Sequence, residues 1–115
     1  MVTMQECRGA LDKLSDNLAN ANPDVRSAAA LDRSLSCHIT DLDVTFAGRL
    51  KNGRIDVTDT VQGPPRDKAQ IRLAMTGDDL VAMVDGSLNF AKAWASGRVR
   101  LEASFLDLLR LRALL

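Results

Sequence analysis

The feature that most restricts the fold of this chain is a change in the spacing of its apolar residues near Ser34. Before this point, apolar residues such as Cys7, Leu11 and Leu14 follow one another at steps of three or four, which predicts an amphipathic helix. From Leu35 onward, apolar and polar residues alternate, which predicts strands with one buried face. Because each pattern leaves one apolar side to bury, we expect the chain to pack helices against a sheet.

Capping residues mark where the N-terminal helices begin. Thr3 and Glu6 have the spacing of a capping box, in which each side chain bonds the other residue's backbone amide. The helix behind this box is expected to run to about Asn20. A second, alanine-rich helix is expected over residues 25–31, with Asn22 as its cap. The apolar stripe of the first helix consists of Met4, Cys7, Leu11, Leu14 and Leu18.

Four strands are expected in the middle of the chain. The Asn52-Gly53 pair favours a tight hairpin between the second and third of them, since both positions tolerate positive φ. Residues 62–67 contain Gly-Pro-Pro and interrupt regular structure before the fourth strand. The strands are expected over residues 34–39, 44–50, 54–58 and 70–75.

The C-terminal part is expected to alternate short helices with one more strand. Thr76 should cap a helix that Gly86 ends in a left-handed conformation, and Asn89 should cap the next helix. A fifth strand is expected over residues 98–102, and Ser104 begins a last, leucine-rich helix. This order predicts an α+β fold with a five-stranded mixed, mostly antiparallel sheet covered on one face by helices, and an apolar cavity between the layers.

The last helix has more apolar surface than a single contact with a sheet requires. One apolar arc contains Phe105 and Leu109, and a second contains Leu108, Leu111 and Leu115. Three uses remain open for the surplus: more core, a lid over a bound apolar ligand, or the face of a homodimer.

Composition and charge restrict the partners of this chain. The 115 residues are expected to form one domain, residues 1–115, around a single core. Fifteen basic and fifteen acidic residues give a formal net charge of zero, which argues against a nucleic-acid-binding protein. No apolar run has the length of a transmembrane segment and no signal-peptide pattern is present, so we expect a cytoplasmic protein. Cys7 and Cys37 are expected to be free, buried thiols.

The sequence contains no set of residues typical of a catalytic or metal site. His38 is the only histidine, and the alternation of its strand points it away from Cys37. Asp78 and Asp79 lie in the first turn of a predicted helix, where capping and the helix dipole explain both carboxylates. We therefore expect no enzymatic activity, no metal and no cofactor.

Three motifs follow one another in the C-terminal half of the chain. Ile71-x-Leu73-x-Met75 precedes a helix that starts at Asp78-Asp79-Leu80. Asp85-Gly86-Ser87-Leu88-Asn89-Phe90-Ala91 and then Ser96-Gly97-Arg98-Val99-Arg100-Leu101 come next. Their order and spacing resemble the sterol carrier protein family, type two, and most of all its small stand-alone bacterial members. The resemblance implies binding or transfer of a fatty acid, acyl-CoA, sterol or phospholipid, without catalysis, in a cavity between sheet and helices.

By the same resemblance, the terminal helix would form part of a lid over that cavity. Trp94 could line the cavity or belong to an ordinary core. Basic side chains at the cavity mouth would meet a carboxylate or phosphate, the candidates being Arg98, Arg100, Arg110 and Arg112. The alternative is an interaction module of the same fold, with a collapsed cavity, that dimerises through the leucines of the last helix. The expected cavity residues are Leu73, Met75, Leu80, Met83, Val84, Phe90, Trp94, Val99, Leu101, Phe105, Leu108, Leu109 and Leu111.

Overall fold

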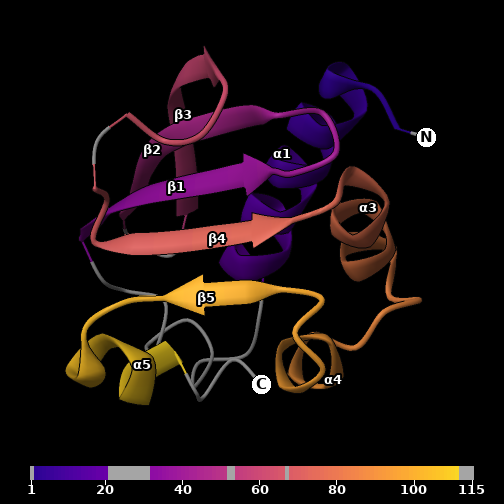
Figure 1. The fold of residues 1–115 in the computed structure, drawn as a ribbon. Helices are drawn as coiled ribbons and strands as arrows, with labels where there is room; N and C mark the ends of the chain where they lie inside the picture. Colours follow the sequence, from indigo (N-terminus) through magenta and orange to yellow (C-terminus); the bar gives the residue numbers. More distant parts are fainter. Residues whose placement is uncertain (1, 21–31, 52–53, 67, 112–115) are drawn as a thin grey trace.

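The computed structural model describes residues 2–20, 32–51, 54–66 and 68–111, apart from the side chains of residues 18, 19, 110 and 111. The helices and strands follow the predicted order (Figure 1). The helix predicted over residues 25–31 and the Asn52-Gly53 turn lie outside the described residues. The elements are α1 (Met4–Ala19), β1 (Arg33–Ile39), β2 (Val44–Lys51), β3 (Arg54–Gln62), β4 (Ile71–Met75), α3 (Gly77–Asp85), α4 (Phe90–Ala95), β5 (Arg100–Glu102) and α5 (Phe105–Leu111).

The strands form one sheet in the order β3-β2-β1-β4-β5. β2 runs antiparallel to both β1 and β3, and β5 runs antiparallel to β4. β1 and β4 are parallel neighbours, with Leu35 opposite Ile71 and Ile39 opposite Met75. The five-stranded sheet is therefore mixed and mostly antiparallel, and the predicted α+β fold class is confirmed.

Two strands differ in length from the prediction. β3 extends past Thr58 to Gln62, because β2 pairs with it along its whole length. β5 is shorter than predicted, since the residues before it complete the turn after α4. The backbone amides of Arg98 and Val99 both donate to the carbonyl oxygen of Ala93, at 2.9 and 3.2 Å, and so are not available for a strand.

A β-bulge interrupts the pairing of β2 with β3, where the register shifts between Ala47 and Gly48. A bulge places an extra residue in one strand and brings the two backbones close together. A Cβ atom at residue 48 would overlap the backbone oxygen of Asp56 on β3. The close approach of the two strands therefore requires glycine at this position.

The predicted caps at α1, α3 and α4 are confirmed. Thr3 and Glu6 form the reciprocal box, with both amide-to-side-chain hydrogen bonds at 3.1 Å. Asn89 Oδ1 accepts the amide of Lys92 at 3.0 Å, and Gly86 ends α3 with a φ of 90°. These contacts are local in sequence, which is why the sequence predicts them.

At the start of α3 and of α5, the side chain of the cap residue makes one capping bond. Thr76 Oγ1 accepts the amide of Asp79 at 3.1 Å, and Ser104 Oγ accepts the amide of Asp107 at 3.2 Å. The two aspartate carboxylates do not return to the caps. Asp79 binds Arg98, and Asp107 binds Arg33 on β1. A charged partner from another element therefore replaces the reciprocal capping bond at both helices.

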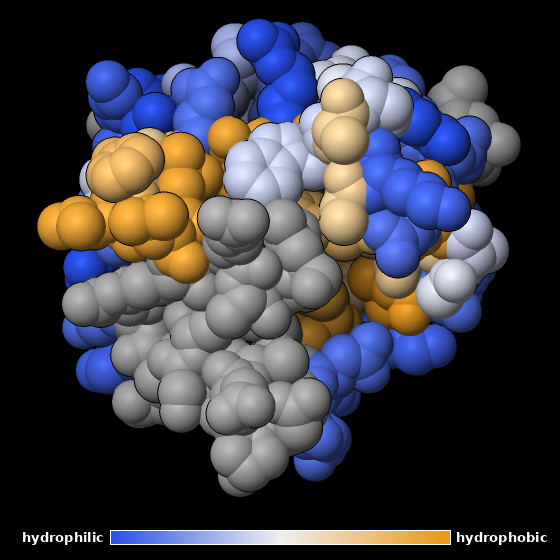
Figure 2. All heavy atoms as spheres, turned by 90° about the horizontal axis from the view of Figure 1, so that it is seen from below, coloured by the Kyte–Doolittle hydropathy of each residue, from blue (hydrophilic) through white to orange (hydrophobic). Residues whose placement is uncertain are grey.

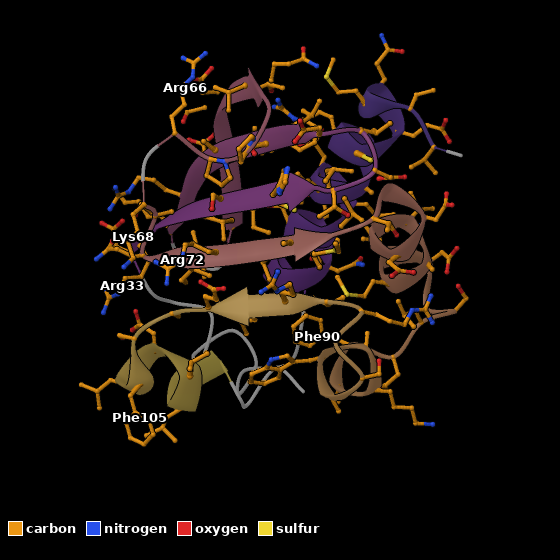
Figure 3. The ribbon with its side chains drawn as sticks, viewed as in Figure 1. Arg33, Arg66, Lys68, Arg72, Phe90 and Phe105 are labelled. Atoms are coloured by element: carbon orange, nitrogen blue, oxygen red, sulfur yellow. The ribbon has the colours of Figure 1, made fainter. Side chains whose placement is uncertain are left out.

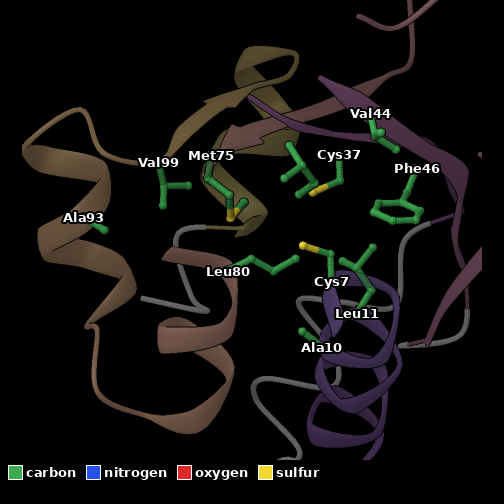
Figure 4. Close-up of a cluster of buried hydrophobic side chains, with 11 residues drawn as sticks. Cys7, Ala10, Leu11, Cys37, Val44, Phe46, Met75, Leu80, Ala93 and Val99 are labelled. Carbon is green, nitrogen blue, oxygen red and sulfur yellow. The ribbon is translucent and has the colours of Figure 1, made fainter. Parts of the chain in front are cut away.

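The main hydrophobic cluster fills the space between the sheet and α1, α3 and α4, which lie on the same side of the sheet (Figure 4). The sulfur atoms of Cys7 and Cys37 point toward each other across this space. Met4, predicted on the same stripe of α1, is instead 46% exposed, because it lies in the first turn of the helix. The buried members of the cluster are Cys7, Ala10, Leu11, Cys37, Ile39, Val44, Phe46, Met75, Leu80, Ala93 and Val99.

The loop after β3 covers part of the opposite face of the sheet. Thr45 Oγ1 donates to the backbone oxygen of Gly63 at 2.8 Å, which ties the loop to β2. Ser36, on β1, is only 2% exposed. Loop residue Pro65 and strand residue His38 line a hollow of about 160 Å³ together with Ser36. This side of the sheet therefore has polar side chains and a partial cover, while the helices occupy the other side.

Candidate functional site

The residues predicted to line a cavity differ in how deeply the structure buries them. Met75, Leu80 and Val99 are buried completely and belong to the main cluster. They come from β4, α3 and the turn before β5, which converge beside α1. Their side chains contribute to the core and leave little surface for any further contact.

A second group of predicted residues is only half-buried. Leu73, Met83, Val84 and Phe90 pack on the outside of the main cluster. Leu101 packs with Leu73 on a smaller cluster formed by Leu35, Leu50 and Ile71. Each of these side chains keeps an accessible surface that an apolar ligand could cover.

Trp94 belongs to the half-buried group and lies on α4 beside Phe90. The ring centroids of the two residues are 6.3 Å apart, with the ring planes inclined by 40°. This is a favourable tilted arrangement of aromatic rings. Trp94 is thus placed to report any change around α4 through its fluorescence.

The predicted residues on α5 point mostly to solvent. Phe105 is 74% exposed and Leu109 is 49% exposed, while Leu108 is half-buried. The side chain of Leu111 is not described. Leu106, which the sequence analysis did not place in the site, is 71% exposed. Figure 2 shows hydrophobic surface over α5.

Two further apolar residues pack with the predicted set, although the sequence analysis left them out. Val81 on α3 and Leu88 in the loop before α4 are half-buried against the main cluster. Val81 lies three residues before Val84 on α3, so its helical spacing gave a signal that could have been used.

A polar hollow of about 540 Å³ lies where β1, β4, β5 and α5 meet. Three of its lining residues are cations, Arg33, Lys68 and Arg72, and one is a carboxylate, Asp107. Figure 3 shows the three cations together at one side of the sheet. We call this the basic hollow. Its other lining residues are Ala69, Gln70, Ala103 and Ser104.

Hydrogen bonds fix the two arginines of the basic hollow in place. Arg33 Nε donates to Asp107 Oδ2 at 3.0 Å, and the Asp107 side chain is almost fully buried. Arg72 donates to Glu102 Oε2 at 3.2 Å and to the backbone oxygen of Ala69 at 2.9 Å. These residues are far apart in sequence, so only the parallel pairing of β1 with β4 reveals that they share one site.

Two of the four arginines predicted at a cavity mouth, Arg98 and Arg100, have side chains that the structure describes. Arg98 binds Asp79 at the start of α3. Arg100 lines the smaller hollow on the face of the sheet away from the helices. The side chain of Arg110 and the whole of Arg112 are not described.

Cys7 and Cys37 are both almost completely shielded from solvent. Burial raises the pKa of Cys37 to about 12, with a smaller contribution from Cys7. Burial also raises the pKa of Cys7, with nearby Asp41 as the next cause. Both cysteines are free, as predicted. A thiol with a raised pKa is a poor nucleophile at neutral pH, so these cysteines have a packing role.

His38, the only histidine of the sequence, lies near the end of β1. His38 Nε2 lies 2.9 Å from Asp43 Oδ1, in the turn between β1 and β2, and does not meet Cys37. Within residues 2–20, 32–51, 54–66 and 68–111, no group of three or more His, Cys, Asp or Glu side chains could hold a metal ion. Among the helices described, none has the length and apolar character to cross a membrane.

The sequence model of the SCP-2 sterol transfer family matches residues 11–115, which is almost the whole chain. The chain belongs to the SCP-2 sterol transfer family. Membership confirms the resemblance seen in the C-terminal motifs. No curated protein sequence matches the chain significantly.

Solved structures share the SCP-2 fold with this chain. A crystal structure of sterol carrier protein 2 has a TM-score of 0.63 and 17% identity, covering 97% of this chain and 89% of that one. Palmitated sterol carrier protein 2 like 2 from Aedes aegypti has a TM-score of 0.58 and 12% identity, covering 97% and 92%. The sec-alkylsulfatase Pisa1 from Pseudomonas sp. has a TM-score of 0.55 and 25% identity, covering 90% of this chain but only 16% of the sulfatase.

Proposed function

We propose that this SCP-2 family member binds and transfers an apolar ligand between its sheet and its helices, without catalysing a reaction. Family membership over residues 11–115 is the observation that carries the proposal. The half-buried apolar side chains of β4, α3, α4 and β5 support it, because they provide surface that a ligand could cover. Fatty acids, acyl-CoA, sterols and phospholipids are the ligand classes in question.

The proposed lining is the set of residues predicted from the sequence. Apart from residues on α5, its half-buried members are Leu73, Met83, Val84, Phe90, Trp94 and Leu101. Each methylene moved from water into such a site contributes ~0.8 kcal/mol, so about ten buried carbons give a gross ~8 kcal/mol before ordering costs. Burial of an acyl chain can therefore drive binding without any polar contact, and polar groups would then select the head group.

Native mass spectrometry of the purified protein, followed by extraction and analysis of any bound molecule, is the first test. We expect a fatty acid or phospholipid at close to one molecule per chain. The second test is a titration of the delipidated protein with palmitate, which was bound to the Aedes aegypti relative. We expect the Trp94 emission to shift to shorter wavelength as the ligand displaces water around α4.

Trp94→Phe is the control for the titration, since it removes the only tryptophan and keeps an aromatic side chain on α4. The variant should bind palmitate by mass spectrometry but give no fluorescence change. An apo mass together with flat titrations for palmitate, a sterol and a phospholipid would contradict the proposal.

A second candidate function is an interaction module that dimerises through α5. The exposed side chains of Phe105, Leu106 and Leu109 favour it, because a partner could cover them. Sedimentation equilibrium tests this candidate: it requires a dimer that Leu106→Glu dissociates. A monomer at high protein concentration would exclude it.

A further inference from the structure

The face of the sheet opposite α1 has a small hollow of its own, of about 160 Å³. In Figure 1 this face is toward the reader, with α1 behind the sheet. Residues directly opposite each other on neighbouring strands point to the same face of a sheet. Ala74, at the centre of one such row, has the smallest side chain in it and so leaves room for the hollow. The first row consists of Ser36, Arg72 and Glu102, and the second of His38, Ala74 and Arg100.

Ser36 contributes an unpaired hydroxyl to this hollow. The residue lines the hollow and is almost completely buried, and its Oγ atom has no hydrogen-bond partner among the described residues. The buried hydroxyls of Ser15 and Thr45 show the usual arrangement, since Ser15 accepts the amide of Ile55 at 2.9 Å and Thr45 donates to Gly63 at 2.8 Å. A buried hydroxyl without a partner is rare, because it loses its bonds to water and gains none in return. A ligand in the hollow would provide the partner that Ser36 lacks.

The charged side chains around the hollow leave one cation uncompensated. Arg72 Nε donates to Glu102 Oε2 at 3.2 Å, so these two charges offset each other. His38 Nε2 is 2.9 Å from Asp43 Oδ1 and is therefore already engaged. Arg100, on the edge strand β5, is exposed and forms no ion pair with any described residue. The hollow thus combines one free guanidinium group with one free hydroxyl.

We propose that this hollow binds a small carboxylic acid that carries a second oxygen, such as a 2-hydroxy acid. The forked donors of Arg100 match the two oxygens of a carboxylate. β1 and β5 lie on either side of β4, so their backbones are about 10 Å apart. Ser36 and Arg100 would therefore bind different ends of one ligand, and the Ser36 hydroxyl would bond the second oxygen.

Size and charge both select a small monoanion for the hollow. Its volume corresponds to about five water molecules, which excludes a long acyl chain. One negative charge balances the free charge of Arg100, whereas a phosphate dianion would add a charge that Glu102 repels. The hollow lies on the other face of the sheet from the proposed apolar ligand, so this inference does not depend on that function.

Titration of the ¹⁵N-labelled protein, followed by the NMR shifts of its backbone amides, tests the proposal at constant ionic strength. Three probes of similar size are compared: lactate, propionate, which lacks the hydroxyl, and lactamide, which lacks the charge. We expect saturable shifts with lactate, concentrated on β1, β4 and β5 around Ser36, Ala74 and Arg100. Propionate should bind more weakly than lactate, and lactamide should bind most weakly.

Substitutions separate the two ends of the site. Arg100→Gln should raise the Kd of both lactate and propionate at least about tenfold, because it removes the charged partner of the carboxylate. Ser36→Ala should raise the Kd of lactate about fivefold and leave that of propionate unchanged, since only lactate has the second oxygen. Arg54→Gln is the matched control, because it changes an exposed arginine on β3, the other edge strand of the sheet. The control should bind lactate as the original protein does.

Thermal unfolding shows whether each variant keeps its fold. Ser36→Ala should unfold at the same temperature as the original protein or at a higher one, because it removes an unpaired buried hydroxyl. Equal shifts with all three probes, or equal binding of lactate by Arg100→Gln and Arg54→Gln, would overturn the proposal. So would shifts confined to α3 and α4, on the other face of the sheet. The absence of saturable shifts with every probe would show that the hollow holds water only.

Discussion

Two regions on the same face of the sheet use their apolar residues differently. Where α1 packs on β1 and β2, Cys7, Leu11 and Phe46 are almost completely buried. Around α4, β5 and α5, the side chains of Phe90 and Trp94 are only half-buried. The first region is a closed core, while the second keeps apolar side chains partly accessible to solvent.

The contrast shows where stability and binding reside in this fold. The core beneath α1 contributes the larger share of the free energy of unfolding, because apolar surface removed from water is the main stabilising contribution. The region around α4 and α5 can gain stability only if something covers its surface. The apolar ligand proposed above acts on this second region.

Leu11→Ala should lower the free energy of unfolding by about 3 kcal/mol, since it leaves a cavity in the closed core. Leu109→Ala makes the same chemical change on α5, where the side chain is 49% exposed. It should change the free energy of unfolding by less than about 0.5 kcal/mol. Urea unfolding measures both values. Equal losses in the two variants would show that the two regions are packed alike.

Alkaline pH should destabilise the closed core through Cys37. Its pKa is about 12 in the folded protein, compared with an ordinary value of 9.0, so the unfolded chain loses the thiol proton first. The contribution to stability is complete below pH 9 and is lost as the pH rises toward 12. The free energy of unfolding should fall by about 1.4 kcal/mol per pH unit in this range.

Cys37→Ala provides the control for the pH experiment, because it removes the titrating group. Urea unfolding of this variant across the same range should show a smaller slope than that of the original protein. An identical slope in both proteins would mean that the thiol is not protected from water in the folded state.

The aromatic pair of the second region should contribute less to stability than Leu11 in the closed core. Phe90→Ala, Trp94→Ala and the double variant form a cycle that measures the coupling between the two rings. At a centroid distance of 6.3 Å and a tilt of 40°, we expect a coupling of about 0.5–1 kcal/mol. Urea unfolding followed by circular dichroism gives the four values. A coupling near zero would show that the rings do not stabilise each other.

Local signals made most of the fold predictable from the sequence. Thr3, Thr76 and Asn89 begin their helices as expected, because a cap depends on neighbours within one turn. The family was also predictable, since its motifs follow one another in the C-terminal half. The alternation of β1 placed Cys37 and Ile39 in the core correctly.

Contacts between distant segments explain what the sequence did not show. Leu80 and Met83 occupy equivalent positions on the apolar face of α3, yet only Leu80 is completely buried. Periodicity identifies the face but not what lies opposite it. The basic hollow was missed for the same reason, because Arg33 and Arg72 meet only after β1 and β4 have paired.

The parallel pairing of β1 with β4 has a consequence for the order of folding. β1, β2 and β3 are joined by short connections, so their antiparallel contacts close small loops of chain. β4 must instead return past this whole meander to reach β1, and closing a longer loop costs more conformational entropy. The meander should therefore form first and serve as the template for β4, and β5 can add only to β4. The region proposed to hold the ligand is then the last part of the molecule to assemble and the first to open.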